Sequence, residues 1–183
     1  MTTSASSALM IRLATSEDLV ALSALMMLSI DQLQSAFLSP EQVEASHEIM
    51  GLDTQLILDG TYYLVMAGDR IAGCGGWSRR ATLFGGDQTP GRNAALLDPA
   101  VDAARIRAMY THPDFARRGV GSLIIRTCEA AAAGEGFGRT EMAATLSGEP
   151  LYLAMGYTVL EPFDGQTSRG VTVPLKRMGR SLA

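Results

Sequence analysis

The stretch that decides how this sequence is interpreted is Phe115-Ala116-Arg117-Arg118-Gly119-Val120-Gly121-Ser122. Residues 103–111 before it read as a β-strand that ends at His112-Pro113. The side chains after it fall at helical spacing, at Val120, Leu123, Ile124, Thr127, Cys128 and Ala131. The sequence therefore predicts a strand that passes into a helix through a turn rich in glycine and arginine.

A turn of this composition at the start of a helix suits a pyrophosphate. The free N–H groups of a helix N-terminus and the positive end of its dipole attract anions. Glycine lets the backbone approach a phosphate closely, and arginine adds charge-assisted hydrogen bonds. An ordinary tight turn with a solvated basic pair explains the same residues, so the interpretation needs a second motif.

The second motif is Gly148-Glu149-Pro150-Leu151-Tyr152-Leu153-Ala154-Met155-Gly156-Tyr157, followed by a strand-like Thr158-Val159-Leu160. In their order and spacing, the two motifs resemble the GNAT superfamily of acyl-CoA-dependent N-acyltransferases. The first resembles the family's pyrophosphate loop, Gln/Arg-x-x-Gly-x-Gly/Ala, and the second resembles its Leu-Tyr-x-x-x-Gly-Phe/Tyr helix. The resemblance covers residues 10 to 176.

The remaining elements occur in an order that fits this resemblance. We expect strands at 8–14, 62–67, 71–78, 103–111, 139–145, 157–161 and 170–175, with a turn around Asp164-Gly165 before the last. The resemblance implies an α/β (α+β) protein with a GNAT-like three-layer α-β-α fold. Its mixed, mostly antiparallel sheet has six or seven strands and splays between strands 4 and 5, where the cofactor enters. We expect one N-acetyltransferase domain at 8–183 behind a flexible N-terminal tail at 1–7.

Two helices are predicted before the first hairpin. Thr15 or Ser16 can cap the first, whose apolar stripe is Leu19, Leu22, Met26, Ile30, Leu33 and Phe37. Ser39-Pro40-Glu41-Gln42 is a capping box that opens the second. Residues 81–102 show little periodicity, and such a long loop is either a lid on the substrate side or a plain insertion.

The resemblance implies an N-acetyltransferase that carries an acetyl group from acetyl-CoA to the amine of a small-molecule, protein or peptide acceptor. The amine attacks the thioester directly, and a tetrahedral intermediate expels the CoA thiolate. The alternative is a non-catalytic acyl-CoA-binding or regulatory module that keeps the same fold. Turnover in the presence of an acceptor distinguishes the two.

The resemblance also assigns residues to acetyl-CoA. The phosphates would be held by Arg117, Arg118, Gly119, Val120, Gly121 and Ser122. Ala116 departs from the family pattern, which has Gln or Arg at that position, so one side-chain contact is lost. The thioester would lie along Met109, Tyr110 and Thr111, where the family's strand bulges or splays and its backbone pairs with the pantetheine arm.

Tyr152 matches the family's general acid, which protonates the CoA sulfur. Without the resemblance, a half-buried tyrosine that packs on an amphipathic helix explains the same residue. No general base is evident, because the motif strand carries Arg105 and Arg107 but no carboxylate. Glu141 is the nearest acidic candidate. A water-relayed base or an amine that arrives neutral is equally open.

Arginines next to the expected acceptor site suggest a small acceptor that carries an anionic group. Trp77, Arg79 and Arg80 end the hairpin strand near that site, and Arg105 and Arg107 share one strand face. Any of these arginines can bind a carboxylate, and each can equally be a solvated surface charge.

Composition limits the other classes. A net charge of -4 and a pI of about 5.1 argue against nucleic-acid binding through bulk positive charge. Cys74 and Cys128 read as reduced core thiols, and no spacing suggests a metal site. No segment is long and apolar enough for a membrane helix, and no signal peptide is apparent, so we expect a cytoplasmic protein. A homodimer that pairs through 171–175 is compatible with the sequence.

Overall fold

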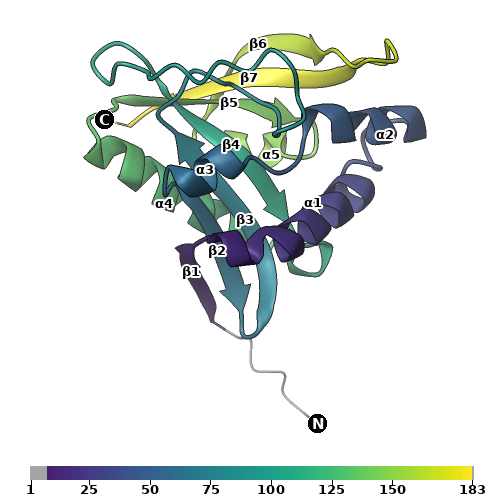
Figure 1. The fold of residues 1–183 in the computed structure, drawn as a ribbon, viewed down its shortest axis with the longest axis horizontal. Coiled ribbons are helices and arrows are strands. Elements are labelled where there is room, and N and C mark those ends of the chain that lie inside the picture. The colour runs from purple at the N-terminus through teal and green to yellow at the C-terminus, as the bar shows by residue number, and fades with distance from the viewer. Residues whose placement is uncertain (1–7, 183) are drawn as a thin grey trace.

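The computed structural model describes residues 8–182, so the tail expected at 1–7 lies outside the described residues. A sheet of seven strands in the order β1-β2-β3-β4-β5-β7-β6 forms its centre (Figure 1). All neighbouring strands are antiparallel except β4 and β5. The predicted mixed, mostly antiparallel sheet is thereby confirmed. The strands are β1 (Leu9–Leu13), β2 (Tyr62–Ala67), β3 (Arg70–Ser78), β4 (Ala104–Thr111), β5 (Arg139–Thr145), β6 (Thr158–Gly165) and β7 (Val173–Ser181).

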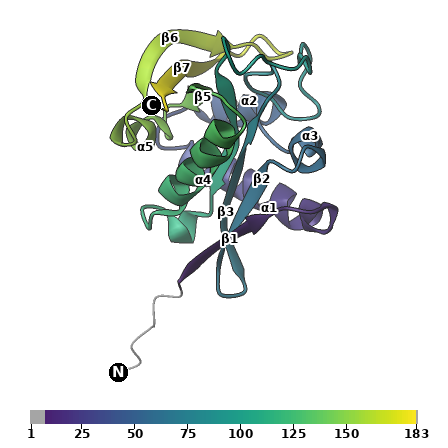
Figure 2. The same ribbon diagram turned by 90° about the vertical axis from the view of Figure 1, so that its left-hand side faces the viewer.

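Helices cover both faces of the sheet and complete three layers (Figure 2). One face carries α1 (Leu19–Leu33), α2 (Pro40–Ile49) and α3 (Thr54–Leu58), and the other carries α4 (Val120–Gly134) and α5 (Glu149–Ala154). Each face buries its own apolar cluster, because successive side chains of a strand point to opposite sides. The cluster under α1 includes Leu22, Met26, Ile30, Leu56, Leu64 and Leu175, and the cluster under α4 includes Val65, Ile106, Ile124, Cys128, Met142 and Met178.

The capping signals give the helix starts correctly. Gln42 N donates to Ser39 Oγ over 3.2 Å, and Ser39 N donates to Gln42 Oε1 over 3.1 Å, as the capping box predicts. The apolar stripe, however, extends beyond the first helix. The helix α1 ends at Leu33, and Phe37 lies in the following turn with 50% of its surface exposed. The prediction that Phe37 belongs to the buried stripe was therefore wrong.

The last two strands differ from the prediction. The strand β6 continues to Gly165, through the turn expected at Asp164-Gly165, and β7 begins only at Val173. Pro162 is tolerated because β6 is an edge strand that needs backbone partners on one side only. Within the segment 171–175, for which pairing with a second subunit is compatible with the sequence, residues 173–175 pair with β6, and Leu175 also pairs with β5.

Two irregularities in β4 shape the centre of the molecule. Its parallel pairing with β5 ends after two pairs, Ala104 with Thr140 and Arg105 with Glu141, so the strands part. Ala108 has a φ of 49°, and the register against β3 shifts between Cys74 and Gly76. The strand therefore bulges beside the point where it leaves β5, as the resemblance implied.

Gly76 in β3 has no room for a side chain, because a Cβ there would lie 2.5 Å from the carbonyl oxygen of Thr61. We expect Gly76→Ala to lower the free energy of unfolding by about 1–3 kcal/mol, as overpacking does. Gly134→Ala is the control, since a Cβ at this last residue of α4 meets nothing within 4 Å. It should raise stability by up to about 1 kcal/mol. Urea unfolding of both variants measures the difference, and equal midpoints would contradict the steric argument.

Candidate functional site

The turn before α4 forms a backbone concavity at the helix N-terminus. Arg117 and Gly119 both have positive φ angles, of 62° and 85°, and such alternation turns successive N–H groups toward one point. The first hydrogen bond of the helix runs from Leu123 N to Gly119 O, so the N–H groups of residues 120–122 precede it. The first turn of α4 holds no acidic side chain, and no side chain caps it. The concavity is therefore suited to an anion.

The two arginines of this turn are exposed and add positive charge beside it. The Arg118 guanidinium lies 5.5 Å from the centre of the Phe115 ring, which restrains it next to the helix start. Arg117 pairs with no acidic side chain among residues 8–182. Both cations remain free to contact a phosphate.

The two sequence motifs touch in the structure. Gly121 lies against α5, where an added Cβ would collide with Leu151. Gly148 lies against the ring of Tyr152, with its Cβ position 2.8 Å from Cε2. The glycines thus allow α5 to pack closely on the start of α4, which places the tyrosine near the anion concavity.

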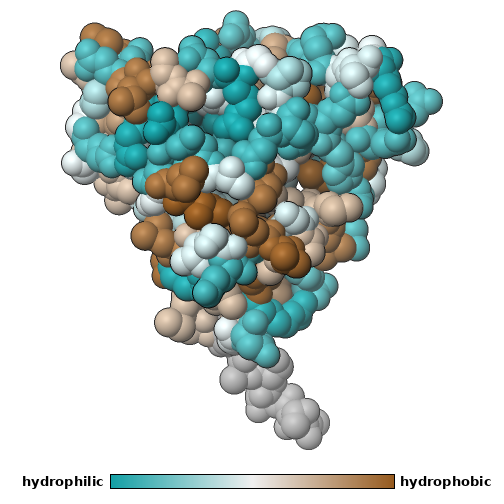
Figure 3. All heavy atoms as spheres, in the orientation of Figure 1, coloured by the Kyte–Doolittle hydropathy of each residue, from teal (hydrophilic) through white to brown (hydrophobic). Residues whose placement is uncertain are grey.

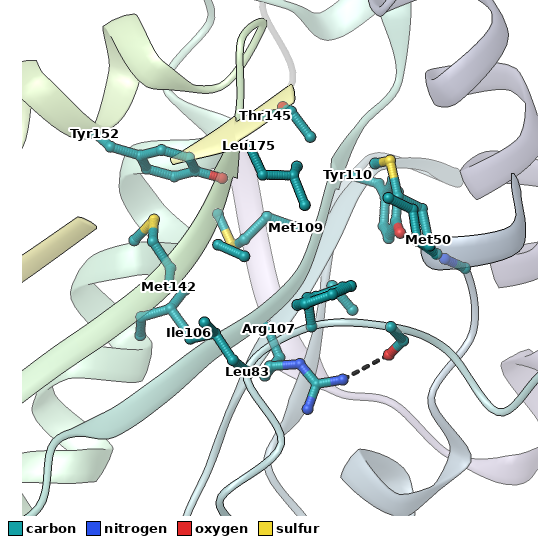
Figure 4. Close-up of a pocket in the computed structure, with 16 residues that line it drawn as sticks. Met50, Leu83, Ile106, Arg107, Met109, Tyr110, Met142, Thr145, Tyr152 and Leu175 are labelled. Carbon is teal, nitrogen blue, oxygen red and sulfur yellow. Dashed lines mark hydrogen bonds between the residues drawn. The ribbon is translucent and has the colours of Figure 1, made fainter. Parts of the chain in front are cut away.

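The gap between β4 and β5 opens into a cavity of about 70 Å³ (Figure 4). Met109 and Tyr110 of β4 line it, whereas Thr111 does not. Beyond Arg105, the edge of β4 that faces β5 has no strand partner, so its backbone groups can pair with an extended ligand. The wall consists of Ile49, Met50, Gly51, Leu83, Phe84, Gly85, Ile106, Arg107, Ala108, Met109, Tyr110, Met142, Ala143, Thr145, Tyr152 and Leu175.

Tyr152 points its hydroxyl into this cavity (Figure 4). The side chain is 7% exposed, and burial raises the pKa of its phenol to about 12. Among the described residues, no group forms a hydrogen bond with that hydroxyl. A protonated hydroxyl without a protein partner can donate to a ligand atom in the cavity.

Arg107 and Tyr110 of β4 fix the cavity wall on the side of α1–α3. The buried guanidinium of Arg107 donates to the carbonyls of Thr82 over 3.0 Å and Gly85 over 2.6 Å, both in the long loop 81–102. The hydroxyl of Tyr110 accepts a hydrogen bond from Gly51 N over 2.8 Å. The long loop therefore lies against the cavity, on the side where a lid was considered.

Asp53 neutralises the arginines behind this wall. Its carboxylate, 1% exposed, lies 2.9 Å from Arg107 Nη2 and 2.7 Å from Arg92 Nη2. These three side chains also line a polar cavity of about 260 Å³ on the far side of the loop. Sequence analysis missed Asp53, although an aspartate directly before Thr54 is a helix N-cap signal.

Glu141 is paired with two arginines and does not face the cavity, unlike a carboxylate that could take a proton from a substrate there. Its Oε2 lies 2.7 Å from Arg105 Nη1 and 2.6 Å from Arg177 Nη2, and it does not line the cavity. Arg105 and Glu141 form the last backbone pair before β4 and β5 separate. The carboxylate thus joins β4, β5 and β7 at the point where the sheet opens.

The residues expected to hold an acceptor lie away from the cavity. Trp77 is 2% exposed and packs edge-on against Phe137, with ring centres 6.1 Å apart. Arg79 pairs with Glu135 over 2.6 Å, and Arg80 pairs with Asp59 over 2.7 Å. The structure gives all three side chains partners within the fold and does not bring them together with Tyr152.

Other features of the described chain concern alternative functions. No helix among residues 8–182 is long and apolar enough to cross a bilayer. The same residues contain no group of three or more His, Cys, Asp or Glu side chains placed to hold a metal ion. Cys74 and Cys128 are both free and buried, and burial raises the pKa of each thiol.

Comparisons with known proteins agree with this geometry. The family model described as "Acetyltransferase (GNAT) family" matches residues 27–157. No curated protein matches the sequence. A GCN5-related N-acetyltransferase from Rhodopseudomonas palustris has a similar structure, with a TM-score of 0.71 and 21% identity over 98% of this chain and 99% of that one.

Two further similar structures contain the cofactor. PaiA N-acetyltransferase from Thermoplasma acidophilum, in complex with coenzyme A, has a TM-score of 0.64 and 12% identity over 95% of this chain and 99% of that one. YncA from Salmonella typhimurium, with its cofactor acetyl-CoA, has a TM-score of 0.63 and 14% identity over 97% and 95% of the two chains. At these identities the likeness shows the shared fold.

Asp53 should be essential for the stability of the wall. We expect Asp53→Ala to lower the free energy of unfolding by about 3–5 kcal/mol, because it leaves the buried guanidinium of Arg107 without a carboxylate and removes the nearer of the two carboxylates beside Arg92. Glu44→Ala is the control, since the Glu44 side chain is 70% exposed and pairs with the similarly exposed Arg169 over 3.0 Å. It should cost about 0–1 kcal/mol in the same urea titration. A loss below 1 kcal/mol for Asp53→Ala would show that the buried pairs do not hold the wall.

Proposed function

Because this chain belongs to the GNAT acetyltransferase family, we propose that it transfers the acetyl group of acetyl-CoA to the amine of a small molecule. The observation that carries the proposal is that one cavity, in the gap between β4 and β5, combines an unpaired strand edge and the Tyr152 hydroxyl beside the anion concavity of α4. A protein or peptide acceptor is the other option for the same chemistry.

We assign described residues to three parts of acetyl-CoA, namely the pyrophosphate, the pantetheine arm and the thioester. The N–H groups of residues 120–122, with Arg117 and Arg118, would hold the pyrophosphate. The free edge of β4 would pair with the amides of the pantetheine arm. This pairing directs the thioester toward the bulge at Ala108, where a backbone N–H can polarise its carbonyl oxygen.

Tyr152 would supply the proton that the leaving sulfur needs. The amine nitrogen forms a bond to the thioester carbon, the carbon–sulfur bond breaks, and the phenol donates its proton to the sulfur. The amine loses one proton to water, and the phenolate regains one from water, so that the overall exchange balances. Since the pKa of the buried phenol is raised to about 12, Tyr152 stays protonated at neutral pH and can act as the acid.

No described carboxylate lines the cavity to act as a base. Glu141 is paired with two arginines and lies outside the cavity wall, so we do not assign it that role. We propose instead that the amine enters in its neutral form and releases its proton to water after attack.

The first test is titration of the protein with acetyl-CoA, followed by measurement of free CoA with a panel of amines. Binding with CoA release that depends on an amine supports the proposal. Binding without release under any amine would favour the alternative of an acyl-CoA-binding module. Absence of binding would remove the basis for both functions.

Ser122→Glu tests the phosphate site separately from the fold. A carboxylate in the first turn of α4 should repel the pyrophosphate and weaken acetyl-CoA binding at least about tenfold. The same charge interacts favourably with the helix dipole and should stabilise the fold by about 0.3–1 kcal/mol. Ala130→Glu adds the same charge to an exposed position of α4 and should leave affinity unchanged. Calorimetry and thermal unfolding of both variants measure the two effects. Equal affinity in the two variants would place the phosphates elsewhere.

Tyr152→Phe tests the acid. We expect kcat to fall by roughly 10²–10⁴-fold with little change in the affinity for acetyl-CoA. In the wild type, ionisation of the phenol should not lower kcat until the pH approaches 12. Tyr157→Phe is the control, since its hydroxyl bonds Glu129 over 2.9 Å and does not line the cavity. A wild-type rate in Tyr152→Phe, with chemistry rate-limiting, would exclude the acid role.

A further inference from the structure

The charges around the cavity restrict which acceptor it can take. Among the described residues that line the cavity, Arg107 is the only one with a charged side chain. Its guanidinium points away from Tyr152 toward the long loop (Figure 4), where Asp53 and two carbonyl oxygens accept its hydrogen bonds. The cavity therefore offers no uncompensated cation to an acidic acceptor.

Apart from Arg117 and Arg118 at the proposed phosphate site, the arginines considered for the acceptor and those behind the cavity walls have acidic partners. Arg105 and Arg177 share Glu141, and Arg79 pairs with Glu135. The polar cavity behind the loop is lined by three arginines and two aspartates, and each of these arginines has an acidic partner. Those last pairs are Arg80 with Asp59, Arg92 with both Asp53 and Asp87, and Arg107 with Asp53. A carboxylate or phosphate brought into the cavity would lose its hydration without gaining an unpaired cation as a partner.

The wall toward the acceptor side is apolar. It consists of Ile49, Met50, Leu83, Phe84 and Leu175, and the loop and helix end that carry it are held by Arg107 and Tyr110. Figure 3 shows that the upper part of the visible face is mostly hydrophilic. The volume of about 70 Å³ is under half of the roughly 150 Å³ of a cavity that holds benzene, so it admits a slender group.

From these charges, we propose that the acceptor is a small aliphatic primary amine with no carboxylate or phosphate within about three bonds of the amine nitrogen. The inference rests on the proposed acetyl transfer and specifies its substrate class. It replaces the anionic acceptor expected from the sequence, because Arg79 and Arg80 are engaged elsewhere. Free amino acids are accordingly poor substrates.

Two amines of the same shape test the proposal. Isopentylamine and β-alanine each have six heavy atoms, and an isopropyl group in the first stands where the second has its carboxylate. We expect kcat/KM for isopentylamine to exceed that for β-alanine by about 10–100-fold, because the carboxylate would be desolvated without a partner. Equal or better use of β-alanine would overturn the inference while leaving the acetyl transfer intact. Acetylation of neither amine, nor of any other in the panel, would overturn both.

A charge placed in the wall should invert this preference. Leu83→Arg puts a cation on the lining of the cavity and should raise kcat/KM for β-alanine while lowering it for isopentylamine. Leu96→Arg is the matched control, since it places the same charge in the same long loop at a side chain that is 67% exposed. If Leu83→Arg does not fold, Met50→Lys makes the same test from the end of α2. An unchanged ratio in the folded wall variant would show that the acceptor does not contact this wall.

Discussion

The separation of β4 from β5 is the constraint on which the rest of the site depends. Two backbone pairs hold these parallel strands together, and the carboxylate of Glu141, shared between Arg105 and Arg177, reinforces the last of them. Beyond that point each strand keeps a partner on its outer side only, which leaves two unpaired edges facing a gap. The bulge at Ala108 turns the same strand into the gap. The cavity and the free backbone groups of β4 both follow from this one interruption.

Close contacts through glycine bring the chemical groups to that gap. The start of α4 can lie against α5 because Gly121 has no side chain to meet Leu151, and the Tyr152 ring rests on Gly148 for the same reason. On the opposite face, β4 itself holds the wall through the side chains of Arg107 and Tyr110. The strand β4 thus contributes to both parts of the site. Its free edge suits acetyl-CoA, and its side chains hold the wall that would face an acceptor.

Local signals in the sequence predicted the elements and the two motifs well, because capping boxes, glycine turns and periodicity act over a few residues. The Ser39 cap, the strand at 62–67 and the strand at 139–145 appear as predicted. Interactions between distant segments were less accessible. The pairing of Arg79, Arg80 and Arg105 with acidic residues 21 to 56 positions away leaves no trace in periodicity. Because its arginine partners are distant in sequence, Glu141 was interpreted as a candidate base. The predicted strand 157–161 ended directly before Pro162, whereas β6 continues to Gly165.

The position of Pro162 in the edge strand β6 also affects the tendency of the protein to aggregate. An outer strand with apolar Val159 and Leu160, 41% and 52% exposed, is the kind of surface on which another chain can add itself as a further strand. Pro162 has no backbone N–H to donate to an added strand, and the neighbouring Glu161 places a charge at the same edge. Pro162, which directly follows the end of the predicted strand 157–161, therefore protects this edge of the sheet from aggregation through added strands.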